Sequence, residues 1–414
     1  MTEHPPKDLA YDAKLEARVL EVLRAGPKSL GSLVSSSEGA YPTEVLETLR
    51  KLQEAGSVTK TEKNVWLNVG CGNEQNDVQL EKESPPPSRQ VALPEPHPLD
   101  FDWRFDLRTL DFLNRLVEQM NPKSVGILGA PTLFKYLTDQ GKEAHLFDKN
   151  AQVIEFLKSI GYKHITECDL FGHSQEAEFE CVVADPPWYL PHYGAFLAAA
   201  RRLLIPGGKL LISVLPRLTR PSAEVDRREI GVMAFRNGFD LVRSEPGTLH
   251  YESPPFEAEA LKTDGLDLPA WRAGDLCTYV RTTREVLPAV DLSSDEDASW
   301  RTFHLGSMSV KVKWDGDFQT GIFRFEKVTG AASMRLRSVS RRSPVRLGIN
   351  LWTSRNLALD VTRPDLVCQG LELLVEGHGS AAAATAVATG AKLTAVELVQ
   401  LRLLMDILVN ESAR

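Results

Sequence analysis

The sequence predicts an α/β protein with a doubly wound sheet at its centre and a smaller domain on each side. Strand-like and helix-like segments alternate between residues 124 and 281, as in sheets covered by helices on both faces. The chain has 414 residues, more than one hydrophobic core usually serves. A proline-rich stretch and an acidic stretch (284–299) interrupt it. We therefore expect a domain over 11–70, a linker over 71–98, the sheet domain over 99–283 and an accessory domain over 300–414.

The composition is that of an ordinary soluble protein, with 43% hydrophobic and 25% charged residues. No apolar run is long enough to cross a membrane, and the first residues do not form a secretory signal. The five cysteines are scattered and form no CxxC pair, which argues against disulfides and a structural zinc site. We expect a cytoplasmic protein without a metal. With a net charge of −8, any nucleic-acid contact needs a local basic patch.

The N-terminal domain shows a helix, a second short helix, a third helix and two short strands in order. Apolar residues from Leu15 to Leu23 have helical spacing, and Pro42 opens the third helix. This order is similar to a winged helix, in which the third helix would contact DNA. That helix, TEVLETLRKLQEAG, interleaves acids with few bases. We therefore favour packing or formation of a homodimer over DNA contact.

Polar residues and a glycine follow four predicted strands of the central domain. Ligands of open α/β sheets bind beyond the carboxyl ends of the strands, so residues at these ends should share one site. The four residues, after strands near 124–128, 143–147, 165–168 and 181–184, are Gly129, Asp148, Asp169 and Asp185.

This pattern resembles the class I S-adenosylmethionine-dependent methyltransferases, whose sheet is Rossmann-like. The resemblance implies that S-adenosylmethionine is the cofactor. It implies that Asp148 binds the ribose hydroxyls, since a carboxylate accepts two hydrogen bonds from a diol. It also places Asp169 near the adenine amino group and Gly129 in the cofactor loop.

The segment Asp185-Pro186-Pro187-Trp188 resembles the loop of amino-methyltransferases that act on adenine N6, cytosine N4 or a glutamine amide. Such an amine is a poor nucleophile because its lone pair is delocalised. The Asp185 carboxylate and a backbone carbonyl could accept its hydrogen bonds and orient the lone pair. The two prolines remove amide donors. Trp188 would stack on a flat group, with Tyr189 assisting.

The loop after the first strand, residues 128–133, departs from the family pattern. It reads Leu-Gly-Ala-Pro-Thr-Leu, with one glycine and no carboxylate for the methionine amino group. Two residues before the sheet, Asp102 and Arg104, could replace the missing acid and clamp a carboxylate. Alternatively, the aromatic residues Trp103 and Phe105 pack this segment on the sheet edge.

Three functions therefore stay open. The first is N-methyl transfer to a planar amine, with nucleic-acid adenine slightly favoured over a protein amide. The second is aminopropyl transfer, because the layout is also similar to that of the branched-chain polyamine synthases. The loop 128–133 lacks the acids that would hold a polyamine there. The third is a catalytically silent scaffold that binds partners through its flanking domains.

The C-terminal domain is expected to be mostly β and to end in a helix at 395–410. Strand-like segments occur at 309–314, 321–325 and 345–352, and most alternate apolar with polar residues. The stretch Arg335–Arg346 carries five arginines in an acidic protein. It could hold nucleic-acid phosphates or another anionic partner, but a solvated strand face is the reading we favour.

Overall fold

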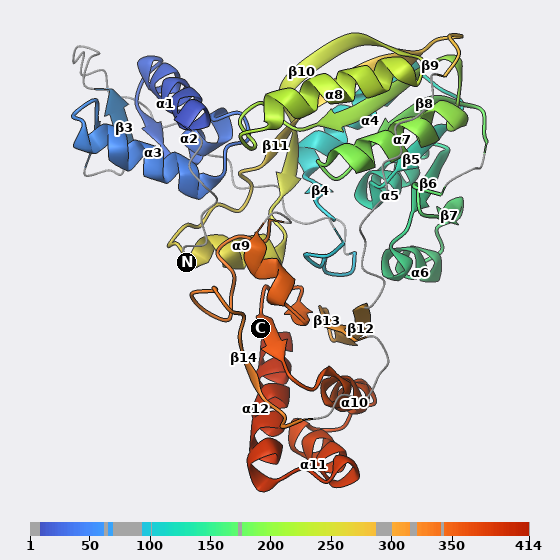
Figure 1. Cartoon of the computed structure of the whole chain (residues 1–414). Coiled ribbons are helices and arrows are strands. Elements are labelled where there is room, and N and C mark those ends of the chain that lie inside the picture. Colours follow the sequence, from blue (N-terminus) through green and yellow to red (C-terminus); the bar gives the residue numbers. More distant parts are fainter. Residues whose placement is uncertain are drawn as a thin grey trace.

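The structure is a computed structural model, and it describes residues 9–61, 65–68, 93–100, 102–172, 176–286, 300–314, 321–340 and 343–413. Three sheets, of three, eight and five strands, build three domains (Figure 1). None of the helices among these residues is long and apolar enough to cross a membrane.

The N-terminal domain contains the three helices and the strand pair that the sequence predicts, and a further short strand. An apolar core forms between its helices, with Leu15, Val19 and Leu49 buried. The same core continues onto the central domain through Leu218 and Trp271. The elements are α1 (Leu9–Arg24), β1 (Lys28–Ser29), α2 (Leu30–Ser36), α3 (Pro42–Glu54), β2 (Val58–Lys60) and β3 (Val65–Asn68).

The central domain has the predicted doubly wound sheet. Its strand order is β4-β10-β11-β9-β8-β5-β6-β7, with parallel pairing from β9 to β7 and antiparallel pairing of β11 and β10. The inner strands are continuous apolar runs because helices cover both faces. The strands are β4 (Arg104–Phe105), β5 (Val125–Leu128), β6 (Ala144–Asp148), β7 (Ile165–Glu167), β8 (Phe179–Ala184), β9 (Leu204–Val214), β10 (Phe239–Glu252) and β11 (Ala273–Arg281). The helices are α4 (Leu107–Met120), α5 (Pro131–Asp139), α6 (Ala151–Ser159), α7 (Leu190–Leu203), α8 (Ala223–Arg236) and α9 (Pro255–Lys262).

The C-terminal domain has the expected antiparallel sheet, in the order β12-β13-β15-β16-β14. The strands are β12 (Trp300–Leu305), β13 (Met308–Lys313), β14 (Phe325–Lys327), β15 (Leu351–Thr353) and β16 (Ala358–Val361), with a 3-10 turn η1 (Pro344–Gly348) before β15. Three helices follow the sheet, whereas the sequence analysis expects one. They are α10 (Pro364–Val375), α11 (Ser380–Ala391) and α12 (Ala395–Ser412).

Two physical reasons explain the missed helices. Helix α10 is a short, largely buried segment, and a short apolar run of this kind does not by itself distinguish a helix from a strand. Helix α11 consists largely of alanine, which has the highest helix propensity but buries little surface. The strand expected at 345–352 is mostly the turn η1, since Pro344 starts a helical turn there.

The end of the predicted linker is packed against the C-terminal domain. Residues 93–98 were assigned to the linker, yet His97 is buried and its Nε2 lies 2.9 Å from the carbonyl oxygen of Trp352. Glu95 forms an ion pair with Arg355 at 3.2 Å. The remainder of the linker, residues 71–92, lies outside the described residues.

The arginine-rich stretch is partly used inside the protein. Arg335 pairs with Glu411 at 2.6 Å and with Glu259 of α9 at 3.2 Å, and Arg337 lies 3.5 Å from Asp264. The contacts with Glu259 and Asp264 join the C-terminal domain to the central domain, whereas the pair with Glu411 lies within the C-terminal domain. The expectation that Arg335–Arg346 forms one solvated face is therefore wrong for Arg335, whereas Arg337 is exposed; residues 341 and 342 lie outside the described residues.

Candidate active site

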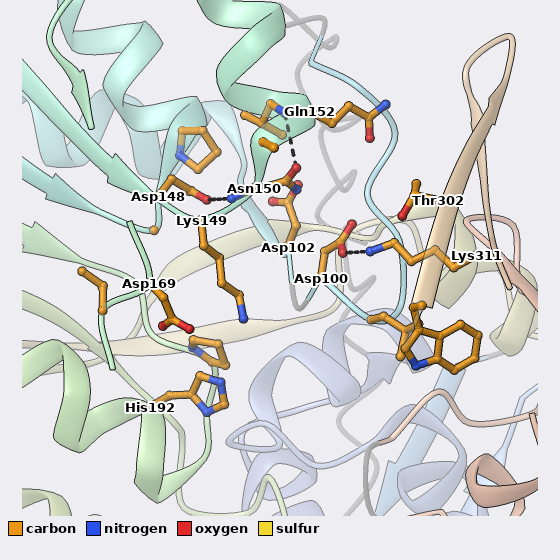
Figure 2. A pocket seen from close by; sticks show the side chains of 18 of the residues that line it. Asp100, Asp102, Asp148, Lys149, Asn150, Gln152, Asp169, His192, Thr302 and Lys311 are labelled. Atoms are coloured by element: carbon orange, nitrogen blue, oxygen red, sulfur yellow. Dashed lines mark hydrogen bonds and ion pairs between the residues drawn. The ribbon is translucent and has the colours of Figure 1, made fainter. Parts of the chain in front are cut away.

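A cavity of about 1120 Å³ opens at the carboxyl ends of β5, β6 and β8, and the C-terminal domain forms its far wall (Figure 2). It collects most of the residues singled out in the sequence. Those that line it are Asp102, Gly129, Asp148, Asp169, Asp185 and Pro187. The others, Arg104, Pro186, Trp188 and Tyr189, are not among its lining residues.

The register of the parallel strands brings the site together. Leu128 of β5 is paired with Phe147 of β6 on one side and with Ala184 of β8 on the other. The Gly129 amide donates to the carbonyl of Phe147 (3.0 Å), and the Asp185 amide donates to the carbonyl of Leu128 (3.1 Å). The residues at the carboxyl ends of three neighbouring strands, β5, β6 and β8, therefore lie side by side.

Gly129 is required at its position by both conformation and space. Its φ is +65°, in the left-handed region that side chains disfavour. A Cβ there would lie 3.0 Å from the ring of Phe196 and 3.4 Å from the carbonyl oxygen of Asp185. The absent side chain leaves the backbone exposed to the cavity beside Asp185.

Replacing Gly129 with alanine should lower the free energy of unfolding by about 2–4 kcal/mol, because left-handed strain and crowding against Phe196 add together. Gly141→Ala is the matched control, since Gly141 also has a positive φ of 77° but has no atom within 4 Å of an added Cβ. The control should lose only the strain, about 1–2 kcal/mol. Urea unfolding of both variants measures the difference. Equal losses of unfolding free energy would show that contact with Phe196 is not a reason for glycine at position 129.

Asp148 is positioned by the start of α6. The backbone amide of Asn150 donates to its Oδ1 at 2.8 Å, and the side chain of Asn150 caps α6 by accepting from the amide of Val153 (3.3 Å). Desolvation, with a smaller contribution from repulsion by Asp102 and Asp100, raises the pKa of Asp148 to about 6, although backbone hydrogen bonds from Asn150 and Lys149 lower it. A carboxylate with few donors and acidic neighbours suits a diol or a cation.

Asp169 and Lys149 face the same part of the cavity. Asp169 accepts a hydrogen bond from the backbone amide of Phe171 (3.0 Å). The side chain of Lys149, the residue after Asp148, extends into the cavity towards Asp169 and His192 (Figure 2). His192 and Phe171 contact each other edge to face at 5.2 Å between ring centroids.

Asp185 ends a chain of hydrogen bonds that runs into the core. The hydroxyl of Tyr251 donates to Asp185 Oδ1 at 2.7 Å. That hydroxyl lies 2.6 Å from Ser213 Oγ, which accepts from the indole nitrogen of Trp188 (3.3 Å). Desolvation raises the pKa of Asp185 to about 7, although the hydrogen bonds from Tyr251 and Ser213 lower it. This carboxyl therefore changes its charge near neutral pH.

Trp188 does not have the position that the sequence analysis expects. It is 9% exposed and packs edge to face on Tyr251, with ring centroids 5.9 Å apart. The guanidinium of Arg272 lies 4.5 Å from its ring centroid. The indole faces the core because its N–H finds an acceptor there in Ser213. Trp188 therefore supports the Asp185 loop and is not placed to stack on a substrate.

Tyr189 and Arg104 also differ from the expectation. Tyr189 starts α7, and Arg220 lies 5.5 Å from its ring centroid. Arg104 is paired with Asp102 at 2.6 Å and donates to the carbonyl of Pro94 at 2.5 Å, so its guanidinium is directed at protein groups. Asp102 lines the cavity and lies close enough to raise the pKa of both Asp148 and Asp185. It places a carboxylate in the cavity that Gly129 of the loop 128–133 also lines.

Several lining residues were not anticipated from the sequence. From the central domain these include His192 and Phe196, which lie one and two turns into α7, directly after the Asp185 loop. Others come from the C-terminal domain, notably Thr302, His304, Lys311, Lys313 and Arg346. In the described part of the chain, no three His, Cys, Asp or Glu side chains are grouped to hold a metal ion.

Comparison with known proteins agrees with this geometry. Residues 102–215 match the family described as "probable N6-adenine methyltransferase". The central domain is methyltransferase-like. This confirms the resemblance drawn from the strand-end residues and the Rossmann-like sheet. No curated protein matches the chain.

Several solved structures are similar in fold to this chain. The branched-chain polyamine synthase from Thermus thermophilus, with N4-aminopropylspermidine and 5′-methylthioadenosine, is 15% identical with a TM-score of 0.50. The likeness covers 69% of this chain and 91% of that one. The C9 mutein of the same enzyme is 14% identical with a TM-score of 0.51, and the likeness covers 69% of this chain and 90% of that one. The N-methyltransferase NodS from Bradyrhizobium japonicum is 11% identical, with a TM-score of 0.29 and coverages of 43% and 86%. At these identities the likeness concerns the fold.

Proposed function

We propose that the central domain transfers a methyl group from S-adenosylmethionine to a planar amine held at Asp185. One observation carries the proposal: Asp185, Gly129 and Asp148 lie at the ends of three adjacent strands and line one cavity. Among amines we favour the N6 amine of a nucleic-acid adenine, in keeping with the description of the matching family.

The residues fit the cofactor by their chemistry. The Asp148 carboxylate can accept both hydrogen bonds of a ribose diol. The missing side chain at Gly129 permits close approach to the backbone. Asp148, together with Asp185 in its ionised form, gives this part of the cavity a negative charge, which suits a sulfonium cation. When bound, S-adenosylmethionine supplies the electrophilic methyl group.

The protein's part in the reaction is orientation and proton acceptance. Ionised Asp185 accepts a hydrogen bond from an amine N–H and directs the nitrogen lone pair into the cavity. Tyr251 fixes the carboxyl by donating to Oδ1. The methyl–sulfur bond of the donor would break as the new N–C bond forms, leaving a neutral thioether. The proton of the resulting cationic amine would pass to the Asp185 carboxylate. A pKa of about 7 suits that acceptor at neutral pH.

Aminopropyl transfer is the second candidate, because the cavity holds more acids than the loop 128–133 suggested. Asp100 and Asp102 both line it. Carboxylates of this kind bind the charged nitrogens of a polyamine. The fold likeness to the polyamine synthase is in keeping with this option.

Calorimetric titration with S-adenosylmethionine and with its decarboxylated form separates the candidates. We expect tighter binding of S-adenosylmethionine, followed by transfer of its labelled methyl group to a deoxyadenylate oligomer. Tighter binding of the decarboxylated form, with transfer to spermidine, would favour the second candidate. Binding of neither would refute both and leave a scaffold role.

A further inference from the structure

The C-terminal domain contributes one face of a β-hairpin to the active-site cavity. In this hairpin, Trp300 is paired with Lys313 and Thr302 with Lys311, so these four side chains share a face. The opposite face carries Phe303, Val310 and Val312, which are buried in the domain's own core. Such alternation gives one apolar face and one polar face, and here the polar face lines the cavity.

The hairpin is held against the methyltransferase-like domain by two contacts. Lys311 forms an ion pair with Asp100, just before β4. His304 Nδ1 lies 3.1 Å from Nε2 of Gln152, near the start of α6. Figure 2 shows Thr302 and Lys311 across the cavity from Asp148 and Asp169. The turn η1 extends the same wall with Arg346.

The two walls of the cavity differ in their charged side chains. The wall formed by the central domain carries four carboxylates and one cation, namely Asp102 (paired with Arg104), Asp148, Asp169, Asp185 and Lys149. The wall formed by the C-terminal domain carries Lys311 (paired with Asp100), Lys313 and Arg346. Lys313 is exposed and ends the hairpin at the cavity rim. A sulfonium donor and an amine suit the carboxylates, whereas basic side chains on the opposite wall suit an anionic group of the same ligand.

The volume leaves room for a second ligand group. Small-molecule pockets are about 300–1,000 Å³, and this cavity is about 1120 Å³. Once the donor occupies the acidic side, the remaining space lies along the hairpin. An acceptor that reaches from Asp185 towards the hairpin would contact Lys311 and Lys313, which line the same cavity.

We propose that the hairpin face formed by Thr302, Lys311 and Lys313, with Arg346, binds a phosphate group of the amine substrate. Lysine and arginine donate charge-assisted hydrogen bonds to phosphate oxygens, and the Thr302 hydroxyl adds a neutral donor. This inference rests on the proposed function and narrows it, because it makes the acceptor an adenine nucleotide, free or within a strand. It also gives the C-terminal domain a direct part in choosing the substrate.

The test compares adenosine with adenosine 5′-monophosphate, which differ only in the phosphate, by calorimetry on the whole chain. The unmodified protein should bind the monophosphate at least about tenfold more tightly. Lys313→Gln should remove most of this preference, and the double variant Lys311→Gln/Lys313→Gln should abolish it. Lys327→Gln is the control, since Lys327 is exposed in the same domain but does not line the cavity.

A labelled short deoxyadenylate strand separates the two sources of the phosphate. If the strand is the substrate, it should bind more tightly than the monophosphate, and each lysine removed should lower the slope of log affinity against log salt by about 1. If the strand binds no better than the monophosphate, the free nucleotide is the source.

The proposal is overturned if the unmodified protein shows no preference for phosphate, or if the preference survives in Lys313→Gln and in the double variant. Donor titration is a separate measurement. Intact binding of S-adenosylmethionine without a phosphate preference would reject this inference alone, while loss of donor binding would reject the proposed function.

Discussion

Asp185→Asn should lower kcat for methyl transfer by about 10²–10⁴-fold while leaving the affinity for S-adenosylmethionine within about threefold. The asparagine keeps the size of the side chain and can still accept from Tyr251, so the loop should keep its structure. It cannot take a proton from the amine, and its amide group can turn a donor towards the substrate. The measurement is single-turnover transfer of labelled methyl groups with saturating donor.

Tyr251→Phe is the companion variant for Asp185. It keeps the aromatic packing on Trp188 but removes the hydroxyl that holds Asp185 Oδ1. That hydrogen bond lowers the pKa of Asp185. Its loss should therefore raise the pH at which the rate falls on the acidic side of the pH–rate profile above about 7. If Asp185→Asn left kcat unchanged, Asp185 would have no part in the reaction.

The affinity for S-adenosylmethionine should fall about tenfold for each pH unit below about 6, the pKa of Asp148. The ribose diol donates its hydrogen bonds to the carboxylate, so binding favours the ionised form. Desolvation raises this pKa above its ordinary value, which places the loss between pH 6 and 4. Titrations across that range measure it.

The raised pKa of Asp148 affects the stability of the fold in the opposite direction to donor affinity. A carboxyl whose pKa is raised on folding is more easily accommodated when protonated, so its contribution to stability is present at low pH and is lost as pH rises through about 6. Asp148→Asn should therefore reduce the pH dependence of both quantities. Donor affinity should be low at every pH, and the unfolding free energy should depend less on pH. A variant with normal, pH-dependent affinity would contradict a ribose-binding role for Asp148.

The sequence predicted the central sheet and its strand-end residues because each signal there is local. A buried strand is a continuous apolar run, and the residue that ends it can be read directly, as with Ala184 and Asp185. The direction of Trp188 could not be predicted in this way. It depends on Ser213 and Tyr251, which come from strands β9 and β10 and meet the loop only in the folded sheet.

The wall contributed by the C-terminal domain was missed for a different reason. Lys311 and Lys313 alternate with Val310 and Val312, which is the usual pattern of a strand with one solvated face. Nothing local distinguishes a polar face in bulk water from one that borders a cavity. For the arginines at 335 and 337, the sequence suggests solvated charges although both have acidic partners in the fold. Those partners, Glu411, Glu259 and Asp264, lie far away in the chain.

The packing of His97 and Glu95 on the C-terminal domain has a consequence for the order in which the protein matures. Domains fold from the N-terminal end during synthesis, so the central sheet can form early on the ribosome. The segment that leads into that sheet finds its partners, Trp352 and Arg355, only after some 250 further residues have been made. A nascent chain thus carries the acidic half of its cavity without the opposite wall. The site becomes complete at a late step of biosynthesis, which delays substrate engagement until the last sheet has closed over it.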